Sequence, residues 1–276
     1  SFNSGKLAMS LDSGATFTQL TGAPSLTWRS VWTSRNFQHM LAASSNSYIY
    51  RSFDQGTTWN PLYSLAPNNW YGVAATCDMQ SIVAGSNNNG YMQISRDGGG
   101  SWTSATGAGS ARWLAIDVSF DFSSIYACRY GSYCSATSDS GASWSTRNFR
   151  SDNWMGVSCD FDFQACAAAS ATSGLWMTTS QRTNGWSNVA AATTATGNNK
   201  KYYGVHMSQD SVKVLVTSSA QNKLLLGVDG SGTASTWSTT NINGASSTAT
   251  GATSQRPCPH GMYSYTGDVA CSMCPS

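Results

Sequence analysis

The sequence contains no glutamate: all 13 acidic residues among its 276 are aspartates. Only 10% of the residues are charged, against about a quarter in a typical globular protein. Glutamate favours helices, whereas the serine, threonine, glycine and aromatic residues that are abundant here favour strands and turns. The net charge of +2 is too small to indicate nucleic acid or an anionic membrane as a partner. We therefore expect an all-β protein with no nucleic-acid partner.

Other signals are also missing. No apolar run approaches the roughly 18 residues of a membrane span, so no span is expected. There is no Asn-x-Ser/Thr sequon, so any sugars would be linked to serine or threonine, as in an O-glycosylated glycoprotein. The first residue is not methionine, and we expect a processing site there or the edge of a longer precursor. The eight cysteines indicate disulfides and a secreted, extracellular location.

A short motif, Ser/Thr-x-Asp-x-Gly-x-Thr/Ser-aromatic, recurs about every 42 residues. We call each copy a box turn. The copies are residues 10–17 (Asp12, Gly14, Phe17), 52–59 (Asp54, Gly56, Trp59), 95–102 (Asp97, Gly99, Trp102) and 137–144 (Asp139, Gly141, Trp144). Degenerate copies follow at 179–186 and 229–237. A second signal, aromatic-x-x-aliphatic, follows the box aromatic by about 11 residues at Trp28, Trp70, Trp113 and Trp154 and recurs at Tyr202.

One repeat contains four short strands, which we place at 70–76, 81–85, 90–95 and 101–105. The box turn joins the third strand to the fourth. Its aspartate accepts hydrogen bonds from its own turn and its glycine supplies a backbone angle closed to other residues. We assign the box residues a structural role. Calcium is not expected because each box has a single carboxylate, and no other metal or cofactor is expected either.

These repeats resemble those of the Asp-box (BNR) β-propellers, which include sialidases and sortilin-type receptors. The resemblance covers roughly residues 1–240 and implies a propeller of four-stranded antiparallel blades. Five complete repeats follow an N-terminal half blade. We expect six blades in a propeller domain of residues 1–255, with 241–255 closing the ring. The alternative is that another chain or a removed segment pairs with the half blade.

The cysteines divide into local pairs and a tail. Cys128 and Cys134, and also Cys159 and Cys166, flank short turns, so we expect each pair to form a disulfide within its blade. Residues 256–276 contain Cys258, Cys271 and Cys274 and resemble the Cys-Pro-x-Gly-x-Tyr-Ser units of extracellular receptors. This resemblance implies disulfides at Cys258 and Cys271 and the start of a further module. Cys77 has no local mate, and a tail cysteine is its expected partner.

Catalysis is not expected. The sialidase resemblance stops at the box turns, because sialidase chemistry needs an arginine triad, a nucleophilic tyrosine and a glutamate, and this chain has no glutamate. A glycosidase with two aspartates is the alternative, with Asp117, Asp121, Asp160 and Asp162 as candidates. We interpret these four as solvated turn carboxylates.

Loops rich in Asn, Tyr and Ser, such as 67–70, 87–91 and 129–133, lie opposite the box turns. They would suit sugar rings, which makes a carbohydrate-binding role the second hypothesis. Our first hypothesis is a non-enzymatic extracellular structural or adhesive module of a cell-surface or appendage assembly. Its partners would be other extracellular proteins or copies of itself, with glycans as the alternative.

Overall fold

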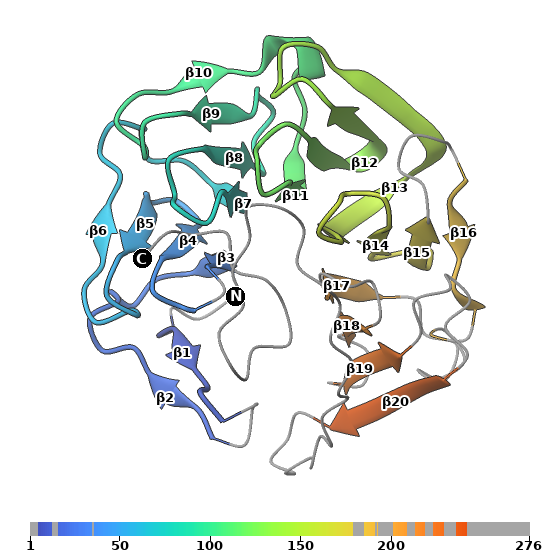
Figure 1. The fold of residues 1–276 in the computed structure, drawn as a ribbon, viewed down its shortest axis with the longest axis horizontal. Helices are drawn as coiled ribbons and strands as arrows, with labels where there is room; N and C mark the ends of the chain where they lie inside the picture. The colour runs from blue at the N-terminus through green and yellow to red at the C-terminus, as the bar shows by residue number, and fades with distance from the viewer. Residues whose placement is uncertain are drawn as a thin grey trace.

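The computed structural model describes residues 5–12, 16–34, 36–178, 185–190, 192, 201–208, 213–218, 223–228 and 236–241. Apart from a 3-10 turn at Thr106–Ala108, the described elements are strands. They form antiparallel sheets arranged around a common centre (Figure 1). The all-β architecture of four-stranded antiparallel sheets is as predicted. No helix in the described part of the chain is long and apolar enough to cross a membrane.

Three sheets have four strands each. We call each sheet a blade and name it after its first strand. The β3 blade contains β3 (Trp28–Thr33), β4 (Met40–Ser44), β5 (Ile49–Ser52) and β6 (Asn60–Pro61). The β7 blade contains β7 (Trp70–Ala75), β8 (Ile82–Ser86), β9 (Gln93–Ser95) and β10 (Thr103–Ser104). The β17 blade contains β17 (Tyr202–Met207), β18 (Lys213–Ser218), β19 (Lys223–Val228) and β20 (Thr236–Asn241).

The other two sheets follow the same plan. A two-stranded sheet pairs β1 (Ala8–Met9) with β2 (Thr18–Gln19). A six-stranded sheet contains two blades that are joined into one. β12 (Ile125–Thr137) runs continuously through the second and third strands of the first of these blades. β13 (Ser145–Cys159) runs through its fourth strand, the link and the first strand of the next blade. The remaining strands of the sheet are β11 (Trp113–Val118), β14 (Cys166–Ser170), β15 (Gly174–Thr178) and β16 (Ser187–Asn188).

In each earlier repeat, a single backbone bridge lies where the six-stranded sheet joins its two blades. Backbone bridges join the turn after the second strand of each repeat to the segment leading into the next: Gly5 with Leu26, Ser47 with Asn68, and Gly90 with Ala111. Tyr130 pairs with Asn153 and Ser132 with Asp152 at the equivalent place, and there the pairing is continuous with the strands. The bridges fasten neighbouring blades along the edge where the chain crosses between them.

The core lies between blades. The aromatic residues that begin the first strands are fully or almost fully buried at Trp70, Trp113, Trp154 and Tyr202. The second strands β4, β8 and β14 are buried along their whole length and consist mainly of small or aliphatic residues. A Cβ placed on Gly85 would come within 2.6 Å of the Trp113 carbonyl oxygen in the next blade. The blades therefore pack so closely that only glycine fits at this contact.

Candidate functional site

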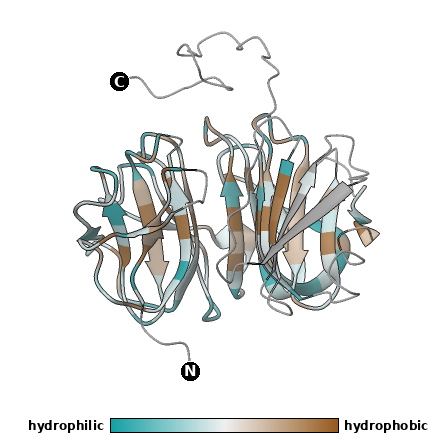
Figure 2. Ribbon diagram, turned by 90° about the horizontal axis from the view of Figure 1, so that it is seen from below, coloured by the Kyte–Doolittle hydropathy of each residue, from teal (hydrophilic) through white to brown (hydrophobic). Residues whose placement is uncertain are grey.

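The antiparallel order of the strands gives the molecule two unlike faces. Turns between first and second strands and between third and fourth strands lie on one side, which we call the box face. Turns between second and third strands and the links between blades lie on the other, which we call the linker face. Figure 2 shows the blades from the side, with the turns of the two faces at opposite ends of the strands.

The box aspartates hydrogen-bond within their own turns. Asp54 accepts hydrogen bonds from the Thr58 backbone N–H at 2.9 Å, the Thr58 hydroxyl at 2.6 Å and the Ser52 hydroxyl at 2.8 Å. Asp12, Asp97 and Asp139 make the same three bonds with their own neighbours. Both oxygens of each carboxylate are thus engaged locally.

These bonds favour the charged carboxylate. The hydroxyl of the residue four positions later is the main cause, and it lowers the pKa of Asp12, Asp97 and Asp139 to about 2. The pKa of Asp54 is lowered for the same reason. The box turns therefore carry fixed negative charges at neutral pH. Among the described residues, no group of three or more His, Cys, Asp or Glu is placed to hold a metal ion.

The other box residues complete each turn. Gly56, Gly99 and Gly141 have positive φ and donate their N–H to the Ser or Thr four residues earlier. Trp59 and Trp144 donate their indole N–H to the carbonyl of their own box glycine, at 3.0 and 3.1 Å. Trp102 instead donates to the Ser64 hydroxyl of the preceding blade, at 3.1 Å. Phe17 is exposed, and Gly14 lies outside the described residues.

A second repeated turn was not predicted from the sequence. The turn between first and second strands places a large apolar residue in the left-handed region at Phe37, Met79, Phe122 and Phe163, with φ between 54° and 60°. In three copies a Ser or Thr hydroxyl donates to an Asn or Asp two residues later. The signal Ser/Thr-x-Asn/Asp-apolar is present in the sequence at 34–37, 76–79 and 119–122. It was obscured because apolar residues rarely adopt this conformation.

The four candidate aspartates of the glycosidase alternative separate into two pairs. Asp121 and Asp162 are exposed in first turns, as interpreted. The interpretation was wrong for the other two. Asp160 is buried, with its carboxylate accepting the backbone N–H groups of Gln164 and Ala165. Asp117 is half-buried in β11 and accepts the Cys159 N–H of the next blade at 2.7 Å.

Asp117 has the most unusual protonation among these groups. Burial raises its pKa to about 7, and the nearby charge of Asp160 also raises it. Hydrogen bonds from Cys159 and Val118 act in the opposite direction but do not outweigh burial. A carboxyl group that titrates near neutrality can act as a general acid or base, which gives this pair catalytic potential.

The predicted local disulfides are confirmed. Cys128–Cys134 and Cys159–Cys166 are bonded, with Cα atoms 3.9 and 4.0 Å apart. Cys77 is also disulfide-bonded. Cys258, Cys271 and Cys274 lie outside the described residues.

A ring of bulged residues marks the inner edge of the linker face. In all five first strands the pairing with the second strand shifts immediately after the leading aromatic residue. The residues inserted by this shift are Arg29, Tyr71, Leu114, Met155 and Tyr203. Bulges redirect side chains and are common beside binding sites. No feature of the sequence motif indicated the shift.

Two arginines stack on tyrosines in this region. The Arg29 guanidinium lies 5.5 Å from the centre of the Tyr71 ring, and that of Arg112 lies 4.3 Å from Tyr130. Arg112 also donates to the Asn87 side chain at 2.7 and 2.9 Å. Burial raises the pKa of Tyr71, and the charges of Arg29 and Arg112 oppose that effect. The inner edge is therefore cationic and aromatic.

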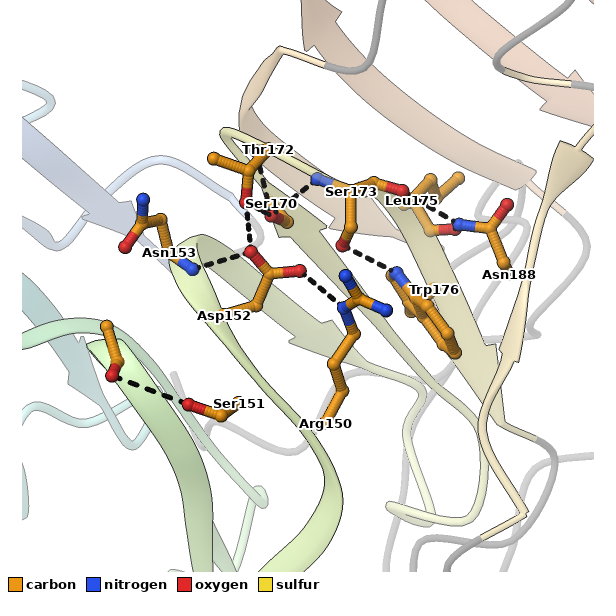
Figure 3. Close-up of polar contacts among 11 residues, drawn as sticks. Arg150, Ser151, Asp152, Asn153, Ser170, Thr172, Ser173, Leu175, Trp176 and Asn188 are labelled. Atoms are coloured by element: carbon orange, nitrogen blue, oxygen red, sulfur yellow. Dashed lines mark hydrogen bonds and ion pairs between the residues drawn. The ribbon is translucent and has the colours of Figure 1, made fainter.

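Further out on the linker face, Asp152 organises a polar network (Figure 3). It accepts the Arg150 Nε at 2.8 Å and bonds from the Thr172 hydroxyl and the Asn153 N–H. Its pKa is lowered to about 2, because hydrogen bonds from Ser173, Thr172 and Arg150 outweigh the opposing effect of burial. Arg150 lies 5.4 Å from the Trp176 ring centre. The network locks the link between two blades and leaves Asp152 charged.

The amides considered for sugar binding are mostly engaged within the protein. Asn88 donates to the Asn68 side chain at 2.6 Å, and the Asn69 side chain accepts the Ser45 hydroxyl at 2.5 Å. Asn87 holds Arg112. The contacts of Asn69 and Asn87 connect neighbouring blades, so the asparagine-rich loops serve the fold as well as facing solvent.

No protein-family model matches the chain, and no curated protein matches its sequence. Solved structures are similar in fold. A chain of a nidogen/laminin complex has a TM-score of 0.69 at 10% identity, covering 85% of this chain and 90% of that one. An ancestral GH74 enzyme has a TM-score of 0.61 at 14% identity, and the match covers 88% of this chain but only 36% of the enzyme. YCF48 bound to D1 peptide has a TM-score of 0.56 at 14% identity, covering 78% and 69%. At these identities the likeness concerns the fold, which is a β-propeller.

Proposed function

We propose that this chain is a non-enzymatic extracellular propeller module with a structural or adhesive role in a surface or appendage assembly. The proposal depends mainly on one observation: the structural match to a chain of the nidogen/laminin complex covers 85% of this chain and 90% of that chain. That complex joins two proteins, so the proposed partners are other extracellular proteins or copies of this chain. The disulfides within blades support a location in an oxidising compartment.

The proposal includes the organisation of the chain. The repeated turns and their hydrogen bonds support membership of the Asp-box propellers. We propose six blades, with residues 241–255 completing the blade begun by β1 and β2, and a further cysteine-rich module starting at 256. Sugars linked to serine or threonine would make the protein an O-glycoprotein.

The test is to fractionate cultures of the source cells. The protein is expected outside the cells in an assembly that sediments, and intact mass would report glycosylation. Recovery from the cytoplasm with free thiols would contradict the proposal.

A carbohydrate-active role is the second candidate, and Asp117 supports it. This carboxyl titrates near neutrality next to Asp160, and GH74 enzymes share the fold. Incubation with a panel of glycosides separates the candidates: turnover that disappears in the Asp117→Asn variant would favour the enzyme, and no turnover with retained cell-surface location favours the adhesive module.

A further inference from the structure

Acidic residues are segregated to one face. Nine of the ten described aspartates lie on the box face or at the strand ends beside it. They are the four box aspartates, three in first turns (Asp78, Asp121, Asp162), and Asp117 with Asp160. Arg51 and Arg96 also reach this face, where each donates to a carbonyl of the next box turn. Among the described residues, the acids outnumber these cations and Lys213, so the described part of the box face is negative.

The linker face has the opposite charge. Arg29 and Arg112 lie at its inner edge, and Arg129, Arg150 and Lys201 lie in its turns and links. Its one described aspartate, Asp152, is paired with Arg150. The described residues therefore give the linker face uncompensated positive charge.

Among the residues whose burial is described, exposed aromatic side chains follow the same division. Those of the box face are all phenylalanines: Phe17, Phe37, Phe53 and Phe120. Those of the linker face are all tyrosines: Tyr63, Tyr91, Tyr133 and Tyr203. Tyrosine and arginine are enriched at protein interfaces, and arginine stacks favourably on aromatic rings. Each face thus offers groups that complement the other: carboxylates and Phe rings on one, guanidinium and phenol groups on the other.

We propose that the box face of one copy of this chain docks onto the linker face of a second copy, so that propellers stack head to tail. The proposal rests on the proposed extracellular structural role and names the contact that would build the assembly. Like faces repel, because both would be negative or both positive, whereas unlike faces attract. Because the box face and the linker face lie on opposite sides of the blades, a contact between them does not close into a ring, so stacks grow at both ends. A second copy is favoured over an unrelated partner because this one chain carries both complementary surfaces.

The first measurement is sedimentation of the purified chain as a function of concentration and salt. The average mass is expected to rise with protein concentration at low salt. It should fall to that of the monomer near about 1 M salt, where the Debye length shrinks to about 3 Å. A monomer at every concentration in low salt would overturn the stacking proposal, while recovery of the native protein in an extracellular assembly would leave the proposed function standing.

Two variants make the test specific. The box-face variant combines Phe53→Lys with Asp162→Lys. Arg96 occupies the place of Phe53 in the next box turn, so a long cation is tolerated there. The linker-face variant combines Tyr91→Asp with Tyr133→Asp at two exposed positions. Asn60→Lys, exposed on the outer strand β6, is the matched control and should associate like wild type.

Head-to-tail stacking predicts a specific result when the box-face variant and the linker-face variant are mixed. Each face variant alone should be monomeric, because it lacks one half of every contact. A mixture should form a one-to-one dimer and nothing larger, since only one intact box face meets one intact linker face. Association of either variant alone to the wild-type extent would overturn the proposal and point to pairing at the β1 edge. A mixture that stays monomeric while wild type associates would overturn it as well.

Discussion

The Asp117 carboxylate accepts the backbone N–H of Cys159 at 2.7 Å and so joins the inner strand of one blade to that of the next. The same geometry recurs one blade later, where the Ser158 hydroxyl accepts the N–H of Met207 at 3.0 Å. Asp117 and Ser158 occupy equivalent positions, four residues after Trp113 and Trp154. A side chain of the inner strand therefore fixes the next blade at two successive interfaces.

The Asp117 contact should make stability depend on pH. Burial raises the pKa of Asp117 to about 7, above the value near 4 of an unfolded aspartate. The unfolded chain then loses this proton first, so the stabilisation is complete below about pH 4 and is lost as the pH rises to about 7. The loss is at most about 4 kcal/mol. Urea unfolding of wild type and Asp117→Asn across this range measures it.

Asp117→Asn should remove this slope, whereas Asp162→Asn, at an exposed first-turn carboxylate, should keep it. Parallel pH profiles for wild type and Asp117→Asn would show that the carboxyl is not titrating in this window.

The box turns should respond to pH in the opposite direction. Hydrogen bonds, first that of the Ser101 hydroxyl, lower the pKa of Asp97 to about 2. The stabilisation is present above about pH 4 and is lost as the pH falls through about 2. Asp97→Asn should lower the melting temperature at pH 7, and the difference from wild type should shrink towards pH 2. Thermal unfolding followed by circular dichroism checks this, and a difference that stays constant down to pH 2 would contradict it.

The sequence was sufficient to predict the blades because their signals are local. The box turn needs only the spacing of Asp97, Gly99 and Ser101 on a single hairpin, and the predicted strands of that blade agree with β7 to β10 within three residues at either end. The Cys128–Cys134 and Cys159–Cys166 pairs were accessible for the same reason, since each bond crosses one hairpin.

Contacts between blades were not accessible in this way. The burial of Asp117 depends on Cys159, 42 residues later, and its neighbouring turn residues gave no hint of it. The clustering of Arg29, Tyr71 and Arg112 requires the ring to bring three repeats together. The bulge that redirects Tyr71 follows from how two strands pair, which residue identity alone does not encode.

Packing between the β7 and β11 blades should depend on the absence of a side chain at Gly85. A Cβ there would meet the Trp113 carbonyl at 2.6 Å and the Trp113 Cβ at 2.8 Å. Backbone cannot move aside cheaply, so Gly85→Ala should cost about 1–3 kcal/mol or more. Gly90→Ala in the same blade is the control, because a Cβ at Gly90 meets nothing within 4 Å. Equal stabilities of the two variants in urea would refute this account of the blade contact.

The Cys128–Cys134 disulfide should stabilise the protein chiefly through the unfolded chain. The two residues are six apart in sequence, and closing so short a loop removes little entropy, which gives about 2 kcal/mol. Both cysteines are fully buried, so replacing them with alanine should retain the fold and lower the stability by about that amount. Urea unfolding of the double variant Cys128→Ala/Cys134→Ala measures the loss.

The double variant Cys159→Ala/Cys166→Ala, with a separation of seven, should lose a similar amount because loop length matters only weakly at this scale. Failure of either double variant to form native β structure would contradict this, because it would mean that the disulfide is required for the fold itself.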